Sequence, residues 1–311
     1  MVIRVVVVLC MALVTLTGCT TAGVNPPVSA TAGTQVPSRT TPAATAPPGA
    51  VTKVLVFMME NHSLAQMRSR MPYAAGLARQ FGYATAYSAV RHPSLPNYIA
   101  IASGQTHGIA DDNAPSVNAI AGGASIFGQA IAAGKTAAVF AEGMPRNCDT
   151  TNGGNGYAVK HNPWAYFPAE RALCQKFDVP VDQLGGTITR GELPTVGMVV
   201  PNLCHDAHDC PLRTADAWFA GWMKQIFAGP DWASGHLAVI LTADEGDNSP
   251  GNTVLTVVIH PSQSADVVST PLSHYSLTRL CEDVAGVPYL SNAATAPSMS
   301  QAFGLAVGAR H

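Results

Sequence analysis

Residues 53–63, KVLVFMMENHS, change from apolar to polar, and this change decides the fold. Lys53 to Met58 is short, continuous and apolar, which predicts a strand buried on both faces. The chain then turns polar, and Glu60 and Asn61 bring oxygen-bearing side chains to the end of that strand. A buried strand followed by polar residues is typical of an α/β protein, whose ligand site lies beyond the carboxyl ends of its strands.

The same change recurs along the chain. Polar sequences follow three further apolar runs: AEGMP at 141–145, PNLCHDAHDC at 201–210 and TADEGD at 242–247. Strands are predicted at 53–58, 83–90, 136–140, 195–200, 236–241 and 253–259, and helices at 72–81, 125–133, 214–227 and 276–285, with a further helix beginning at Asn97. This alternation predicts an α/β domain with a mostly parallel central sheet, at whose edge the polar loops meet.

The first 50 residues differ in composition from the rest. Residues 1–18 combine Arg4 with an apolar run too short for a membrane span, which predicts a secretory signal. The sequence LTGC at 16–19 predicts a lipoprotein signal with the lipid on Cys19, and an ordinary signal peptide is the alternative. Residues 19–50 are rich in Thr, Ala and Pro, which predicts a disordered tether. We expect a folded domain at 51–311, held at the membrane as a cell-envelope lipoprotein or released from its tether.

Charge and cysteine content narrow the class of protein. Charged residues make up 12% of the chain, with 17 Lys and Arg against 19 Asp and Glu, and no basic stripe is present, which excludes nucleic acid as a partner.

In an oxidising compartment we expect disulfides, first Cys204 with Cys210 and then Cys148 with Cys174, which leaves Cys281 unpaired. A zinc site in the CHDAHDC sequence at 204–210 is the alternative, disfavoured because the chain has no CxxC pair.

Acidic and amide side chains gather at two predicted strand ends. Glu60 and Asn61 follow the first strand, and Asp244 and Glu245 follow the apolar run LAVILTA. Acidic groups brought together would repel one another unless a cation neutralised them, although helix capping is an alternative role. We therefore expect these four residues to hold a divalent metal ion, and oxygen ligands favour a hard ion such as Mg²⁺ or Ca²⁺ over zinc.

The sequence RHPSLPNYIAIASG at 91–104 places a serine between two prolines. Pro93 and Pro96 are expected to prevent a regular element across Ser94 and to hold its hydroxyl on a stiff turn. A helix-capping serine is one interpretation and a nucleophile is the other. Because the G-x-S-x-G sequence of the α/β hydrolases is absent, activation by a metal fits a nucleophilic Ser94 better than a triad.

Taken in order, these motifs resemble the phosphoesterase family of bacterial acid phosphatases and phospholipases C, which is related to the alkaline-phosphatase superfamily. The motifs are EN at 60–61, HPSLPNY at 92–98, KHNPW at 160–164, PNLCHDAHD at 201–209, DE at 244–245 and HYS at 274–276. The resemblance covers residues 54–288. It implies a three-layer α/β/α sandwich and hydrolysis of phosphate esters.

The resemblance also implies a role for each matching residue. Ser94 matches a nucleophile that becomes phosphorylated, and His161 and His208 match histidines beside the phosphate. Because histidine titrates near neutrality, these two are expected to protonate the leaving group and favour an acidic optimum. The residues expected to contact the substrate are Asn61, Asn97, Lys160 and Asp206.

His62 departs from the family pattern, because many relatives have arginine there. The chain has no large insertion or extra C-terminal domain of the kind that the larger phospholipases C carry. This favours an acid phosphatase that acts on phosphate monoesters, and we expect a monomer. The alternatives are phospholipase C activity on phospholipids and a non-catalytic surface lipoprotein that binds phosphate-bearing ligands.

Overall fold

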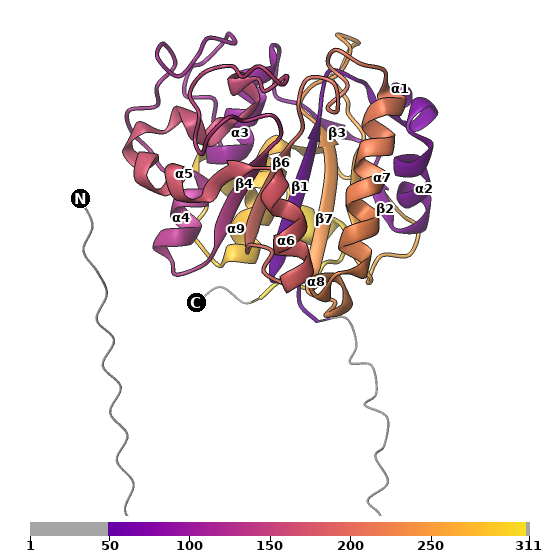
Figure 1. Cartoon of the computed structure of the whole chain (residues 1–311). Coiled ribbons are helices and arrows are strands. Elements are labelled where there is room, and N and C mark those ends of the chain that lie inside the picture. The colour runs from indigo at the N-terminus through magenta and orange to yellow at the C-terminus, as the bar shows by residue number, and fades with distance from the viewer. Residues whose placement is uncertain (1–48, 309–311) are drawn as a thin grey trace, which may run out of the picture. The chain divides into compact units, whose positions relative to one another are not determined.

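β1 (Lys53–Met59) lies in the middle of the main sheet, between β6 (Val196–Val200) and β7 (Leu237–Ala243) (Figure 1). The computed structural model describes residues 49–308, and within them the strand order is β5-β4-β6-β1-β7-β8-β2-β9. The remaining strands are β2 (Gly82–Ala84), β4 (Ala137–Ala141), β5 (Asp178–Pro180), β8 (Thr256–Ile259) and β9 (Asp266–Val268). In this described sheet only β8 runs antiparallel to its neighbours, so the sheet is mostly parallel, as predicted.

The central strands form the core of the domain. In β1, Leu55 lies opposite Gly197 of β6 on one side and Val239 of β7 on the other. A Cβ atom at Gly197 would come within 2.7 Å of the Leu55 side chain, so glycine permits this close packing. All residues of β6 and β7 are buried, which explains why these strands are apolar throughout rather than alternating.

Two groups of helices cover the two faces of the sheet. Figure 1 shows α6 and α7 in front of the strands and α9 behind them. The first group is α1 (Leu64–Arg70), α2 (Pro72–Gln80), α6 (Asp182–Arg190), α7 (Leu212–Ala228) and α8 (Pro230–Ala233). The second is α3 (Ser94–Ser103), α4 (Ile126–Ala132), α9 (His274–Ala285) and α10 (Met299–Ala302). The fold is therefore the three-layer α/β/α sandwich that the resemblance implies.

Short elements complete the domain. α5 (Arg171–Phe177) packs beside β4 and β5, and β3 (Tyr87–Ser88) pairs with β10 (Leu272–Ser273) in a separate two-stranded sheet. The 3₁₀ helices are η1 (Val159–His161), η2 (Pro163–Tyr166), η3 (Pro168–Glu170) and η4 (Ser291–Ala294).

Most predicted elements are present, with ends that shift by no more than two residues. The prediction of one strand at 83–90 is wrong, because the chain forms β2 and β3 there, in two different sheets. The strand predicted at 253–259 begins only at Thr256. The sequence analysis also missed α6, whose two glycines weaken its helical pattern.

The cysteines pair as predicted. Cys204 is bonded to Cys210 and Cys148 to Cys174, while Cys281 is buried and free. The zinc alternative is excluded, because both of its cysteine sulfurs are used in a disulfide. The predicted signal at 1–18, the lipidated Cys19 and the tether up to residue 48 lie outside the described residues. Among residues 49–308 no helix has the length and apolar character to cross a bilayer.

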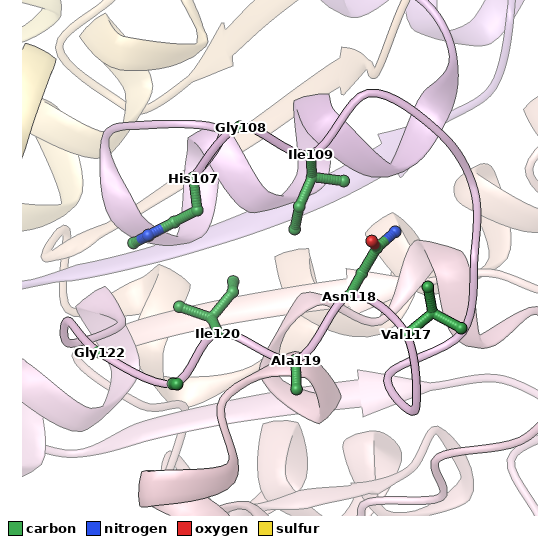
Figure 2. Close-up of a pocket in the computed structure, with 9 residues that line it drawn as sticks. His107, Gly108, Ile109, Val117, Asn118, Ala119, Ile120 and Gly122 are labelled. Atoms are coloured by element: carbon green, nitrogen blue, oxygen red, sulfur yellow. The ribbon is translucent and has the colours of Figure 1, made fainter.

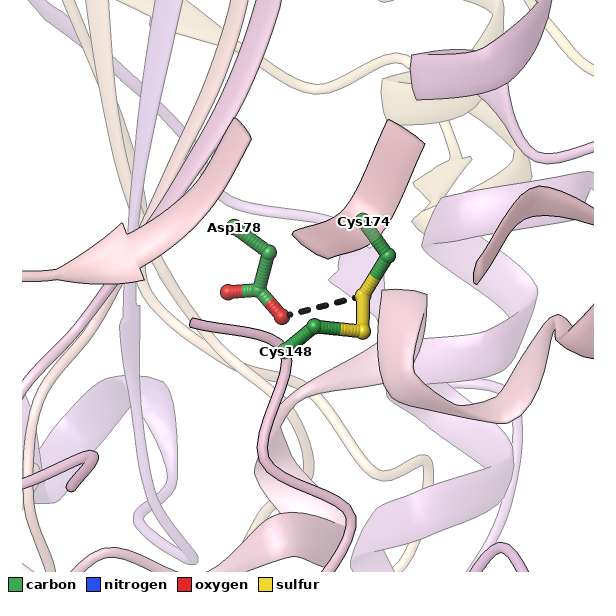
Figure 3. A group of neighbouring side chains, drawn as sticks. All are labelled: Cys148, Cys174 and Asp178. Atoms are coloured by element: carbon green, nitrogen blue, oxygen red, sulfur yellow. Dashed lines mark hydrogen bonds between the residues drawn. A yellow bond between two sulfur atoms is a disulfide. The ribbon is translucent and has the colours of Figure 1, made fainter. Parts of the chain in front are cut away.

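Asp178, the first residue of β5, is buried against the Cys148–Cys174 disulfide (Figure 3). Its Oδ2 accepts a hydrogen bond from Asn162 Nδ2 at 2.8 Å and lies 3.4 Å from Cys174 Sγ. Burial raises the pKa of Asp178 to about 8, although Asn162 and Arg171 oppose the rise. The carboxyl group is therefore protonated in the folded protein at neutral pH.

Asp178 is expected to make folding less favourable as pH rises. The unfolded chain releases this proton near pH 3.8 and the folded chain holds it to about pH 8, so between these values the folded state binds the extra proton. The free energy of unfolding then falls by roughly 1.4 kcal/mol for each pH unit. Urea unfolding with intact disulfides measures this free energy. Between about pH 5 and about pH 8 it is expected to fall less steeply in Asp178→Asn than in the wild type. The exposed Asp182→Asn variant is the control, and a slope in Asp178→Asn equal to that of the control would contradict this account.

Candidate active site

The carboxyl ends of β1, β6 and β7 bring three acidic residues together. Glu60 follows β1 directly, Asp244 follows β7 directly, and Asp206 belongs to the loop after β6. The Glu60 N–H donates to the Asp206 carbonyl at 2.8 Å, and the Asp244 N–H donates to the Met59 carbonyl at 3.0 Å. These backbone bonds hold the three buried side chains in one group, which we call the acidic cluster.

The Ser94 hydroxyl points into the acidic cluster. Its Oγ donates to Glu60 Oε2 at 3.0 Å. Ser94 is the first residue of α3, so the expectation that the prolines prevent a regular element across it is wrong. Pro93 precedes the helix and Pro96 lies in its first turn, where backbone N–H groups have no partner within the helix.

Asn97 holds the backbone before Ser94 rather than facing a substrate. Its Oδ1 accepts from the N–H groups of Val90 and Arg91 at 3.0 and 3.1 Å. Its Nδ2 donates to the carbonyls of Arg91 and Pro93 at 2.8 and 3.2 Å. This fully buried amide is occupied mainly by main-chain groups, which favours a positioning role over the predicted phosphate contact.

His161 lies between two members of the acidic cluster. Its Nε2 is 3.3 Å from Glu60 Oε2 and its Nδ1 is 3.3 Å from Asp206 Oδ2, and neither ring nitrogen has a hydrogen-bond partner. Burial lowers the pKa of His161 well below its usual range, and Lys160 and His208 lower it further. The ring is buried among carboxylates, which favours a ligand role for His161 over the predicted protonation of a leaving group.

The acidic cluster carries unfavourable negative charge. Burial raises the pKa of Glu60 well above its usual range, and the carboxylates of Asp244 and Asp206 raise it further. Burial also raises the pKa values of Asp206 and Asp244 to about 7. Oδ2 of each of these aspartates is buried without a hydrogen-bond partner. Such unsatisfied acceptors beside a neutral imidazole fit a bound cation, which would pair with all of them at once.

Three residues of this site could together hold a metal ion. One ligand atom each from Glu60, His161 and Asp206 lies within 4.8 Å of the others. The sequence predicted Glu60 in such a set but assigned His161 to catalysis and Asp206 to substrate. Asp244 lies close to the group, because its charge raises the pKa of Glu60.

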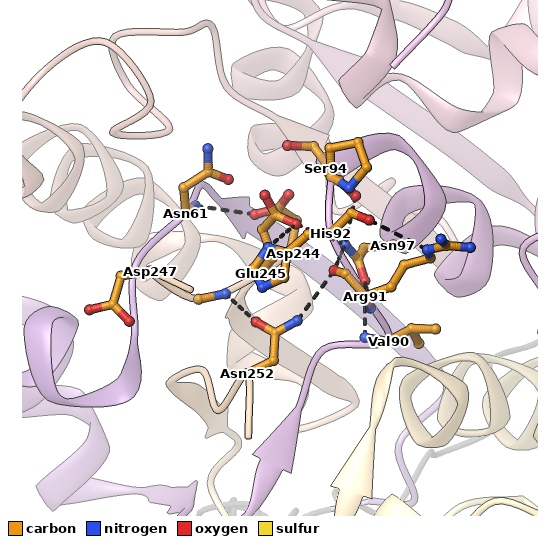
Figure 4. A network of polar contacts seen from close by, with 12 residues as sticks. Asn61, Val90, Arg91, His92, Ser94, Asn97, Asp244, Glu245, Asp247 and Asn252 are labelled. Atoms are coloured by element: carbon orange, nitrogen blue, oxygen red, sulfur yellow. Dashed lines mark hydrogen bonds and ion pairs between the residues drawn. The ribbon is translucent and has the colours of Figure 1, made fainter. Parts of the chain in front are cut away.

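Asn61 and Glu245, the other two predicted metal ligands, lie close to Asp244 (Figure 4). The Asn61 N–H donates to Asp244 Oδ1 at 3.2 Å, and its side-chain nitrogen, when oriented to donate, lies 3.2 Å from Glu245 Oε1. Glu245 Oε2 pairs with His92 Nδ1 at 2.8 Å. Burial and Asp244 raise the pKa of Glu245 to about 8. Both side chains are thus engaged with neighbouring protein groups.

Lys160 and His208 lie at the mouth of the site. Lys160 Nζ pairs with Asp112 Oδ2 at 3.0 Å, and the other oxygen of Asp112 accepts from the Leu95 N–H at 2.9 Å. His208 is partly exposed, its Nδ1 lies 2.7 Å from Asp209 Oδ1, and its ring centroid is 5.9 Å from that of His161. Of the two predicted catalytic histidines, His208 is the one that a substrate can reach.

The sequence analysis missed Tyr98 and Asp112. Tyr98 donates to Glu60 and stacks on His161, with ring centroids 5.1 Å apart. Its position four residues after Ser94, on the same face of α3, is the signal that could have identified it. Asp112 lies in a loop with no periodic pattern, so only the tertiary structure reveals its pairing with Lys160.

The loop after α3 also encloses a separate small cavity of about 340 Å³ (Figure 2). His107 is its only titratable lining residue, and the His107 Nε2 is engaged with Ser103 Oγ at 3.0 Å. The other residues that line it are apolar or amide-bearing, such as Ile109, Ile120 and Asn118. Nothing in this cavity matches the chemistry of the acidic cluster.

Residues 66–288 match the model of the phosphoesterase family. This range contains Ser94, His161, Asp206 and Asp244 and begins after Glu60.

Individual relatives are enzymes of phosphate chemistry. The chain is 29% identical to the phosphatidylinositol-3-phosphatase of Mycobacterium tuberculosis, over 81% of this chain and 82% of that protein. It is 27% identical to the phosphate-repressible acid phosphatase of Penicillium chrysogenum, over 69% of this chain and 54% of that protein, so it spans about half of the fungal relative. A solved structure of an alkaline phosphatase superfamily protein from Vibrio parahaemolyticus has a TM-score of 0.53 at 12% identity, over 77% of this chain and 67% of that one. This last similarity concerns the fold.

Replacing Asn97 with alanine tests its positioning role. The change leaves two backbone N–H groups and two carbonyls without their partner, so we expect the free energy of unfolding to fall by about 2–4 kcal/mol. Urea unfolding measures this loss, and Asn155→Ala, at an exposed loop position, is the control. Unchanged stability with a raised KM would instead support the original assignment to substrate binding.

Proposed function

The chain belongs to the phosphoesterase family, and we propose that it hydrolyses phosphate monoesters through a phosphorylated Ser94. Family membership and the phosphatase relatives make it a phosphoric ester hydrolase. The observation that carries the finer proposal is the Ser94 hydroxyl, which donates to Glu60 at 3.0 Å inside a buried acidic cluster. A free serine hydroxyl is a weak nucleophile, and this environment is one in which it can be activated.

We place a divalent metal ion among Glu60, His161 and Asp206, next to Asp244. When bound there, the ion would lower the proton affinity of the Ser94 hydroxyl and offset charge on the phosphoryl oxygens. The imidazole changes the expected identity of the metal, because a mixed nitrogen and oxygen set suits Mn²⁺ or Zn²⁺ better than Mg²⁺ or Ca²⁺. The orphaned acceptors of the cluster support the site itself.

The residues around Ser94 can carry out transfer in two steps. In the first, Ser94 Oγ bonds to phosphorus, the bond from phosphorus to the ester oxygen breaks, and the serine proton passes to Glu60. His208 then gives a proton to the departing oxygen. In the second, a water oxygen bonds to phosphorus while His208 takes its proton, and the bond to Ser94 breaks as Glu60 returns the serine proton. Inorganic phosphate leaves and Ser94 is restored.

Two further groups position the phosphoryl group. Lys160, whose Nζ lies at the mouth of the site, provides a fixed positive charge for the phosphoryl oxygens. Ser94 is the first residue of α3, and the partial positive charge at this end of the helix stabilises a phosphate.

The substrate and cellular setting belong to the same proposal. The phosphatidylinositol-3-phosphatase relative, matched over most of both chains, makes a lipid-borne phosphate monoester a candidate substrate and disfavours phospholipase C activity. The two disulfides support an oxidising, extracytoplasmic compartment. We retain the leader at 1–18, the lipid on Cys19, the tether and a monomeric domain at 51–311 as proposals.

The test compares Ser94→Ala with the wild type on p-nitrophenyl phosphate. Because the variant lacks the atom that bonds to phosphorus, kcat is expected to fall by about a thousandfold or more. Ser103→Ala, at a buried serine of the same helix that bonds to Ile99, is the folding control and should remain active. Acid-quenched wild type should carry phosphate on Ser94, as seen by mass spectrometry of its peptides. A Ser94→Ala variant as active as the control would overturn the assignment.

A further inference from the structure

A cleft of about 990 Å³ opens beside the acidic cluster and is not used by the proposed chemistry. Its walls come from the end of α1, the start of α7 and two loops. Asn61, which follows Glu60, and His208, which follows Asp206 by two residues, both line it. The cleft therefore begins where the proposed site ends.

Two arginines line this cleft without a protein partner. Arg70 is the last residue of α1, and Arg213 lies in the first turn of α7. Both side chains are exposed, and within residues 49–308 neither guanidinium has a hydrogen-bond or ion-pair partner. By contrast, the carboxylate of Asp209 in the same wall is paired with His208 at 2.7 Å. The unpaired charge of the cleft is therefore positive.

We propose that this cleft binds the leaving group of the substrate, and that Arg70 and Arg213 bind a second anionic group on it. The inference rests on the proposed function and identifies its preferred substrates as phosphate monoesters whose leaving group is itself phosphorylated. The cleft is at the upper end of the size range of small-molecule sites and is larger than one phosphate group requires. Arginine suits the role because its planar fork binds phosphate oxygens in pairs.

The cavity on the other side of His208 does not offer the same chemistry. It has a volume of about 380 Å³, and its one lysine, Lys160, pairs with Asp112 and is already assigned to the transferred phosphoryl group. Of these two cavities, only the cleft lined by Arg70 and Arg213 therefore offers free cationic groups to a second anion.

The test uses two soluble esters that differ only in the far end of the leaving group. They are butane-1,4-diol bisphosphate and 4-hydroxybutyl phosphate, and released phosphate measures both reactions. The wild type is expected to prefer the bisphosphate in kcat/KM, and the double variant Arg70→Met/Arg213→Met to lose about tenfold on it, through KM. On the hydroxybutyl ester the double variant should stay within about twofold of the wild type. The control is Arg79→Met/Lys224→Met, which removes two exposed cations that do not line the cleft.

The outcomes separate this inference from the proposed function. Hydrolysis of both esters without preference, or an equal loss on both in the cleft variant, would overturn the inference and leave the phosphatase function intact. Hydrolysis of neither ester by the wild type would overturn the proposed function and this inference with it.

The second anion can belong to a soluble compound or to a phospholipid head group. A short-chain phospholipid that carries a phosphate monoester on its head group, and its long-chain form in phosphatidylcholine vesicles, distinguish these sources. A tenfold loss by the cleft variant on both lipids as well as on the bisphosphate supports the inference with a lipid source. A loss confined to the bisphosphate supports it with a soluble source.

Discussion

Repulsion among three buried carboxylates is the constraint on which the rest of this site depends. Glu60, Asp206 and Asp244 end up together because the strands that precede them are neighbours in a parallel sheet. Burial of several acids without a positive charge is unfavourable, so either protons or a cation must neutralise them. The raised pKa values of the three acids show neutralisation by protons. The His161 nitrogens, which lie between the acids without a hydrogen-bond partner, indicate neutralisation by a cation.

The geometry around Ser94 follows from that constraint. The hydroxyl donates to Glu60, and Tyr98, one turn further along α3, donates to the other oxygen of the same carboxylate. Asn97, between them in sequence, turns the opposite way and binds the backbone that leads into the helix. Residues of α3 therefore orient the acidic cluster and also hold the backbone that leads into the helix. This support of the backbone explains why a Pro-Ser-x-Pro sequence can begin a helix here.

The sheet and the acidic ends of its strands could be predicted from the sequence, because continuous apolar runs followed by Glu60 and Asp244 are local patterns. The pairing of Asp112 with Lys160 and the enclosure of His161 could not, because they depend on loops of irregular structure that meet only in the folded chain. The sequence also could not show which acidic residues form the acidic cluster. Glu245 pairs with His92, while Asp206 joins the cluster. Adjacency in sequence to a strand end shows that a residue is near the site, but not which neighbour it meets.

The account is tested most directly by the metal content of the protein. After incubation with Mn²⁺ or Zn²⁺ and removal of free ions, elemental mass spectrometry would measure the metal retained by the wild type, Asp206→Asn and Glu245→Gln. The account predicts stoichiometric metal in the wild type and in Glu245→Gln, whose carboxylate is engaged with His92, and a large loss in Asp206→Asn. A wild type that retains no metal, or an Asp206→Asn variant that retains as much as the wild type, would contradict it.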